Sequence, residues 1–216
     1  MTPPSPRTRV RRMNEKAAYD RATVEALLDA IPLAHVGHLV DGFPMVTPTL
    51  QWRTGGRLYW HGSSASRMMR AAAGAPVCVT VTALDGMVLA RSGLEHGVHY
   101  RSVMVFGTAE AVTDPAAKEA ALAAMMERLF PGRWSALRPM TGQELKATAI
   151  LSLPIDEASV KTDAGPPADP PEDQDWPVWA GTVPLVTTPG TPVPAPGLAA
   201  ALAADPPAYL SAFRVT

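Results

Sequence analysis

The 216-residue chain has one cysteine, few aromatic residues and almost no net charge. Because Cys78 is alone, a disulfide within the chain is excluded. The first residues, MTPPSPRTRVRRM, lack the apolar core of a secretory signal, so the cytoplasm is the expected location. The 19 Lys and Arg residues and 20 Asp and Glu residues give a formal charge of −1. No broad basic face is therefore expected, and nucleic acid is not an expected partner.

Long hydrophobic runs are also missing. A bilayer-spanning helix needs roughly 20 consecutive apolar residues. The best apolar stretch, residues 71–84, is shorter and is interrupted by Gly, Pro and Thr. We therefore expect no membrane partner, and the 47% hydrophobic content is sufficient for one buried core.

Proline is abundant and unevenly placed, with 12 of the 23 prolines between Pro166 and Pro207. This distribution predicts four parts: a flexible N-terminal arm (1–15), a folded domain (16–164), an extended Pro/Trp-rich segment (165–187) and a low-complexity Pro/Ala-rich tail (188–216). Trp176 and Trp179 would be costly to expose, so we expect the extended segment to pack on the folded domain or on a partner subunit. Disorder is expected after residue 187, apart from a short helix at 198–204.

Two amphipathic helices are predicted in the folded domain. Apolar residues recur at helical spacing between Val24 and Ile31, behind Asp20 as a cap. The second helix has Asp114 as its cap and Pro115 at its first position, and an apolar stripe reaches from residue 122 to residue 129.

The rest of the domain is predicted to consist of strands. The strand-like runs are 33–40, 43–52, 57–61, 77–84, 87–92, 100–112 and 147–155. The pairs Asp41-Gly42, Gly55-Gly56 and Asp85-Gly86 lie between adjacent runs, and such pairs favour tight hairpin turns. Hairpin joints without alternating helices indicate a mainly β fold, a small antiparallel barrel with flanking helices.

A strand, a serine-rich turn and a helix follow one another at residues 58–70. The turn carries Ser63, Ser64 and Ser66, and the helix carries Arg67 and Arg70. Free N–H groups at the start of a helix favour an anion, so a phosphate is one interpretation of this segment. The other interpretation is ordinary helix capping with solvated arginines, so the spacing alone does not establish a phosphate site.

Two further segments could contact a ligand. Arg101 and Ser102 stand at the polar start of the strand 100–112, where they could face a cleft, a neighbouring subunit or solvent. Pro48 lies inside a predicted strand, which indicates either a bulge with exposed backbone groups or an edge strand.

Metal and thiol chemistry are not expected. His35 and His38 are three residues apart, as are His96 and His99, and on a strand this spacing points two side chains to opposite faces. With one cysteine and no HExxH pattern, no metal site is predicted. Ligation of haem by a single histidine stays open.

Several motifs together resemble a known family. These motifs are DGFPMVTP at 41–48, LYWHG at 58–62, HYRSVMVFGTAE at 99–110, FPGRW at 130–134 and PVWAG at 177–181. The chain resembles the flavin-binding split barrels related to pyridoxamine 5′-phosphate oxidase, and within them the nitroimidazole-reductase (Nim-like) branch. The resemblance covers roughly residues 11–185. It implies a six-stranded antiparallel split barrel and a homodimer that binds FMN at the subunit interface.

The resemblance also implies a set of cofactor-binding positions. They are Thr47, Pro48, Thr49, Leu50, Trp60, His61, Gly62, Ser63, Ser66, Arg67, Arg101 and Ser102. Ser66 and Arg67 match the family's phosphate contact, but Met68 stands where the family usually has lysine. Arg70, one helical turn from Arg67, is a candidate replacement for that cation.

His61 is the one catalytic candidate, because in the Nim-like branch a histidine of the matching strand approaches the flavin. The implied activity is an FMN-dependent oxidoreductase that takes electrons from a nicotinamide donor, NAD(P)H. Its substrate would be a small planar electron-poor molecule such as a nitroaromatic or a quinone. The alternatives are a flavin- or haem-binding protein without turnover, which stores or senses the cofactor, and a structural dimer with an empty cleft.

Overall fold

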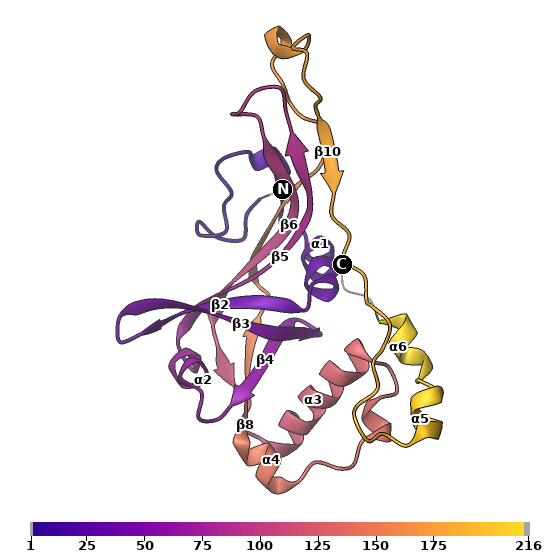
Figure 1. The fold of residues 1–216 in the computed structure, drawn as a ribbon. Coiled ribbons are helices and arrows are strands. Elements are labelled where there is room, and N and C mark those ends of the chain that lie inside the picture. The colour runs from indigo at the N-terminus through magenta and orange to yellow at the C-terminus, as the bar shows by residue number, and fades with distance from the viewer. Residues whose placement is uncertain (1, 214–216) are drawn as a thin grey trace.

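The structure is a computed structural model that describes residues 2–213. It is built around one antiparallel sheet (Figure 1). The strands are β1 (Ala17–Ala18), β2 (Leu33–Val40), β3 (Phe43–Thr54), β4 (Arg57–Ser63), β5 (Pro76–Leu89), β6 (Gly97–Thr108), β7 (Glu110–Ala111), β8 (Thr148–Pro154), β9 (Glu157–Asp163) and β10 (Gly181–Pro184). The α-helices are α1 (Arg21–Ala30), α2 (Arg67–Ala72), α3 (Pro115–Leu129), α4 (Gly142–Ala147), α5 (Ala200–Ala204) and α6 (Ala208–Ala212). Short 3₁₀ turns occupy Asn14–Lys16, Trp134–Ala136 and Pro171–Asp173.

The sheet closes on itself. Its order from β9 through β6, β5, β2, β3 and β4 ends at β8. Only Ile155 and Asp156 separate β8 from β9 along the chain, so the two ends of the sheet are joined covalently. When β8 and β9 are counted as one bent strand, this is a six-stranded barrel. The predicted fold class, a mainly β barrel with flanking helices, is confirmed.

Two of the predicted hairpin turns are present. Asp41 and Gly42 both have positive φ, 52° and 77°, as a tight turn between β2 and β3 requires. Gly55, at 56°, has the same role between β3 and β4. Both helix caps are also present, since the carboxylates of Asp20 and Asp114 accept hydrogen bonds from the first turns of α1 and α3.

The third predicted turn, Asp85-Gly86, is wrong. The strands predicted on either side of it are one strand, β5, and its register against β6 shifts between Leu84 and Gly86, which makes a bulge. Gly86 has a role other than a turn: a Cβ atom there would lie 2.9 Å from the carbonyl oxygen of Val183 on β10. Glycine at this position allows β10 to pair closely with β5.

Other strand boundaries also differ from the predictions. The predicted strand 100–112 is divided into β6 and β7 by Ala109, and β9 was not predicted. The sequence of β9, EASVKTD, alternates too weakly to reveal a half-buried strand.

The main core fills the barrel. Leu58, Trp60, Val79 and Val105 are fully buried inside it. Helix α1 packs on β3, β6 and β9, and α2 packs on β2, β4 and β8, so apolar residues of both helices join this core. In Figure 1, β5 and β6 extend above the barrel as a long arm, and the β2–β3 hairpin projects to the side.

A second, smaller core lies outside the barrel. Helix α3 covers the outer face of β3, β4 and β8 with Leu122 and Met125, which pack on Trp52 and Ile150. None of the helices among residues 2–213 is long and apolar enough to cross a membrane.

In the C-terminal third, the segment 165–187 is mostly extended and contains β10, which pairs with β5, and two short helices lie beyond it. Trp176 and Trp179 are 65% and 64% exposed, so neither packs on the barrel of this chain. Contact with a partner subunit stays a prediction, as do the domain boundaries. Beyond residue 187 the chain passes beside α3 (Figure 1). The predicted helix at 198–204 is present as α5, and α6 follows it.

Helix α4 begins with a capping box that depends on the ionised carboxylate of Glu144, so we expect acid to destabilise the start of this helix. The Thr141 hydroxyl accepts from the Glu144 backbone N–H, and Glu144 accepts from Thr141 and from Arg138, which lowers the pKa of Glu144 to about 2. The folded-state pKa of Glu144 lies below the ordinary value of 4.5. The stability that the ionised carboxylate contributes to the fold is therefore fully present above pH 4.5 and is lost as the pH falls towards 2. We expect Glu144→Gln to flatten the pH dependence of the unfolding free energy in this window, measured by urea denaturation. An unchanged slope would contradict the assignment.

Candidate functional site

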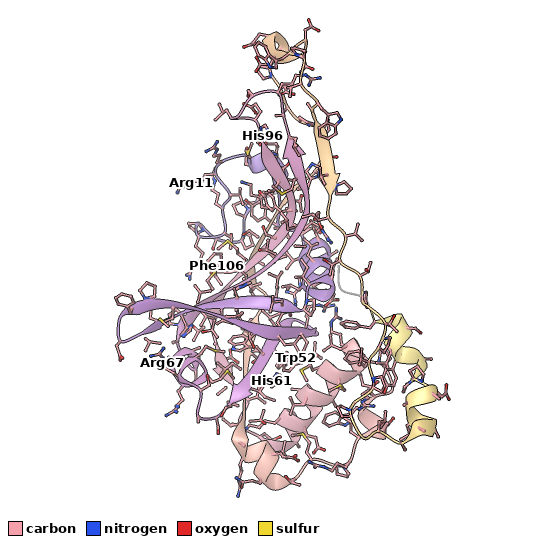
Figure 2. All side chains as sticks on the ribbon, in the orientation of Figure 1. Arg11, Trp52, His61, Arg67, His96 and Phe106 are labelled. Carbon is pink, nitrogen blue, oxygen red and sulfur yellow. The ribbon has the colours of Figure 1, made fainter. Side chains whose placement is uncertain are left out.

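The predicted cofactor-binding residues occupy three places. The first is the end of β4 with the start of α2, the second is the middle of β3, and the third is the middle of β6. Figure 2 shows Arg67 beneath the projecting β2–β3 hairpin and His61 nearer to α3.

The start of α2 presents unpaired polar groups. Ser66 is the N-cap residue, yet its hydroxyl makes no capping hydrogen bond, and Ser63 Oγ accepts from the backbone N–H of Ala65. Arg67 is exposed, and no acidic side chain of residues 2–213 pairs with it. Gly62 lies against α2, because a Cβ atom there would be 3.0 Å from Met69 Cγ. Ser66 and Arg67 are therefore available to an anionic group.

Met68 does not lie beside this anion position. Its side chain is only 8% exposed and belongs to the barrel core. Arg70, the candidate replacement for the missing lysine, donates to the carbonyl oxygen of Ala65 in the same turn. The cations at this turn are thus Arg67 and Arg70, and Met68 has a packing role.

Trp60 and His61 point to opposite sides of β4. Trp60 is fully buried inside the barrel, so its indole is not available to a ligand on the outer face, contrary to its predicted cofactor contact. The reason is the alternation of side chains along a strand, which makes adjacent residues face opposite ways.

His61 is half-buried on the outer face, beside aromatic neighbours. Its ring centroid lies 5.8 Å from that of Trp52, at an angle of 58°, and Trp52 also stacks on Tyr59 at 5.8 Å. The Nδ1 atom of His61 is buried and has no hydrogen-bond partner in the described chain. Burial lowers the pKa of His61, so the neutral imidazole is favoured near neutral pH.

The middle of β3 forms a free edge. Strand β2 pairs with β3 along residues 43–50, whereas β4 pairs only with residues 51–54. The register against β2 is continuous, so Pro48 marks an edge and not a bulge. Thr47 and Thr49 face one side of the strand, while Pro48 and Leu50 face the other. The backbone groups of this free edge can pair with a ligand.

Arg101 and Ser102 already have partners within the chain. Arg101 forms two hydrogen bonds to Asp85, of 2.8 and 2.7 Å, which lower the pKa of that carboxyl group. Ser102 donates to the carbonyl oxygen of Lys161. A cavity of about 550 Å³ beside Arg101 is lined by residues of β5, the start of β2 and the segment 185–187, and by none of the residues near α2. Within a single chain, this cavity does not include Ser66 or Arg67, and a cofactor contact of Arg101 stays a prediction.

Sequence reasoning missed the aromatic surroundings of His61. The hairpin register, Trp52 opposite Tyr59, follows from the Gly55-Gly56 turn and could have indicated this neighbour. No local feature of the sequence indicated that α3 would pack on Trp52. Among residues 2–213, no three His, Cys, Asp or Glu side chains gather as a metal site would need.

Comparisons with known proteins define the family. The model of the pyridoxamine 5′-phosphate oxidase family matches residues 20–162. Among solved structures, the flavocytochrome Anf3 from Azotobacter vinelandii is 45% identical, with a TM-score of 0.95 over 99% of both chains. The FAD and haem binding protein from Mycobacterium smegmatis is 42% identical, with a TM-score of 0.87 over 93% of this chain and 98% of that one.

A more distant structure shares the fold. It is described as a 5-nitroimidazole antibiotic resistance protein from Bacteroides thetaiotaomicron, and it is 19% identical with a TM-score of 0.55 over 67% of this chain and 85% of that one. No protein of curated function matches the chain. From the family match and the two relatives above 40% identity, the chain belongs to the pyridoxamine 5′-phosphate oxidase family.

Proposed function

We propose that this protein binds a flavin and carries out electron transfer with it. The observation that supports this function most strongly is 45% identity over 99% of the chain to a protein named as a flavocytochrome. A bound flavin supplies the redox chemistry, and the protein binds and orients it. Here Ser66 and Arg67 would hold a flavin phosphate, and the free edge of β3 would pair with the polar edge of the ring.

The flavin that we propose is FAD, because the relative at 42% identity is named for FAD and haem. FMN, which the sequence resemblance implies, is the second candidate. Both carry a phosphate for Ser66 and Arg67, so chromatography of the released flavin distinguishes them.

Haem is proposed as a second cofactor, since both close relatives are named for it. A haem iron needs an axial ligand, and a neutral imidazole is the usual one. His61 is the ligand that we propose, because burial lowers its pKa and so favours the neutral ring. Its Nδ1 is buried, so the iron would be held by Nε2. His96 and His99 each contact a backbone carbonyl oxygen through one ring nitrogen and keep the other nitrogen free, so they are further candidates for this role.

A second copy of the chain is the partner that we propose for the apolar surface. Phe43 and Val46 on the projecting hairpin are 72% and 66% exposed, and Leu33 is also exposed. Apolar area of this kind is typical of an interface. A homodimer would cover it and would place two copies of the free β3 edge beside it.

The substrate and the electron donor belong to the same proposal. A small planar electron-poor acceptor and NAD(P)H are the reactants that the resemblance implies, and His61 could also donate its ring N–H to such an acceptor. A steady-state assay with menadione and NADH or NADPH tests turnover against free flavin at the same concentration.

The absorption spectrum of the purified protein tests the cofactors directly. We expect flavin bands near roughly 375 and 450 nm together with a haem Soret band. Arg67→Ala should weaken flavin binding by about one to two decades, because a charge-assisted phosphate contact contributes about 1–3 kcal/mol. Arg11→Ala, which removes an exposed arginine of the N-terminal arm, is the matched control. A colourless protein that does not quench added FAD or FMN would refute the proposed function.

A further inference from the structure

A cavity of about 490 Å³ lies between the C-terminal end of α3 and the C-terminal arm, residues 187–213. Met126 and Phe130 line it from α3 and its C-cap, and Leu198, Leu202 and Leu210 line it from the arm. Figure 1 shows α5 and α6 beside α3, at the side of the molecule away from α2. The volume lies within the range of about 300–1,000 Å³ typical of small-molecule sites.

Two polar groups stand together in this apolar lining. Arg133 Nη1 donates a 2.8 Å hydrogen bond to the hydroxyl oxygen of Tyr209. Since that oxygen accepts, the hydroxyl hydrogen of Tyr209 remains able to donate to another acceptor. The remaining guanidinium N–H groups of Arg133 are further donors on the same side of the cavity.

Arg133 forms no ion pair in the part of the chain that the structure describes, and the nearby Glu127 carboxylate accepts from the backbone N–H groups of Gly132 and Trp134. The neighbouring arginines differ: Arg128 pairs with Asp29 at 3.1 Å, and Arg138 pairs with Glu144 at 2.5 Å. No acidic side chain of residues 2–213 lies within ion-pair distance of Arg133. A cation with a free hydroxyl donor beside an apolar cavity is complementary to one carboxylate on an apolar body.

We propose that this cavity binds a small amphipathic carboxylate, such as a medium-chain fatty acid or an aromatic monocarboxylate. The carboxylate accepts from the Arg133 guanidinium and the Tyr209 hydroxyl, and the apolar body lies against Met126, Phe130 and Leu202. Neither His61 nor Arg67 lines this cavity, so the site is separate from the proposed flavin and haem positions.

The arm that closes the cavity is anchored by aromatic rings. Phe130 stacks on Phe213 with centroids 4.9 Å apart and meets the edge of Tyr209 at 6.1 Å. Tyr209 and Phe213 lie on or just after α6, so one short segment supplies both the hydroxyl and the ring that stacks on Phe130. A ligand bound to Arg133 and Tyr209 would hold this segment in place.

The test is isothermal titration of the purified holoprotein with decanoate and, separately, with decanol. We expect decanoate to bind more tightly, and Arg133→Gln to weaken decanoate by about tenfold or more while leaving decanol unchanged. Arg138→Gln is the matched control, because it removes an arginine of the same segment that already has a carboxylate partner. Leu202→Trp, which fills the cavity, should abolish binding of both molecules.

Three results would overturn the proposal. The first is equal binding of decanoate to the wild type and Arg133→Gln, and the second is binding that survives Leu202→Trp. The third is loss of bound haem in Arg133→Gln, because a haem propionate would then be the carboxylate at Arg133. The absorption spectrum of the bound cofactors is recorded for each variant together with the titration. Loss of flavin or haem can therefore be distinguished from loss of carboxylate binding.

Discussion

Replacement of His61 by alanine is expected to remove the haem Soret band and to leave the flavin bound. The imidazole is half-buried beside Trp52, its Nδ1 has no partner in the described chain, and burial lowers its pKa. Burial therefore favours the neutral ring, which can ligate iron. Without it, haem would lose the axial bond, and the expected occupancy falls by more than about tenfold.

Absorption spectra and a pyridine haemochrome assay on the purified variants measure this effect. His96→Ala is the control, since His96 is exposed and its Nδ1 contacts the carbonyl oxygen of Ser92. A wild-type Soret band in His61→Ala, or a band that disappears only in the control, would rule out His61 as the ligand. If haem is retained and quinone reduction is lost, His61 acts on the flavin substrate.

Truncation of Trp60 to alanine is expected to cause the largest loss of stability, about 3–5 kcal/mol in the free energy of unfolding. The indole is fully buried at the centre of the barrel, where it packs with residues of several strands and both barrel helices. The loss combines the transfer free energy of the ring with the cavity that it leaves. Urea denaturation followed by circular dichroism measures it.

Trp179→Ala is the control for this change, because Trp179 is largely exposed and its removal should alter the monomer by less than about 0.5 kcal/mol. If Trp60→Ala does not fold, Trp60→Phe gives a smaller loss and keeps the comparison possible. Flavin affinity should be unchanged in Trp60→Phe. A lower affinity with an intact fold would show that Trp60 contacts the flavin after all.

Local chemistry explains which parts of the fold could be predicted. Asp20 and Asp114 cap α1 and α3 because their carboxylates bond to N–H groups three residues away, and that geometry depends on neighbouring residues alone. The Asp41-Gly42 turn likewise depends on two residues that tolerate positive φ. Such features follow from the sequence itself.

The Asp85-Gly86 pair shows where local reasoning stops. The same dipeptide type forms a turn at residues 41–42 and a bulge within β5 at residues 85–86. The difference is that β10, almost one hundred residues later, pairs with β5 at Gly86. A contact so distant in the chain has no signature in the local sequence.

The candidate site divides in the same way. The sequence by itself determined the barrel class, the helix caps, two hairpin turns and the residue types at positions 61–67, because these follow from side-chain chemistry and short-range geometry. Only the tertiary structure decided that Trp60 and Met68 face the core, that Asp85 pairs with Arg101, and that α3 packs on Trp52, the neighbour of His61. The physical reason is that burial and partners depend on which segments meet in space, and pairing between distant strands and helices determines those meetings.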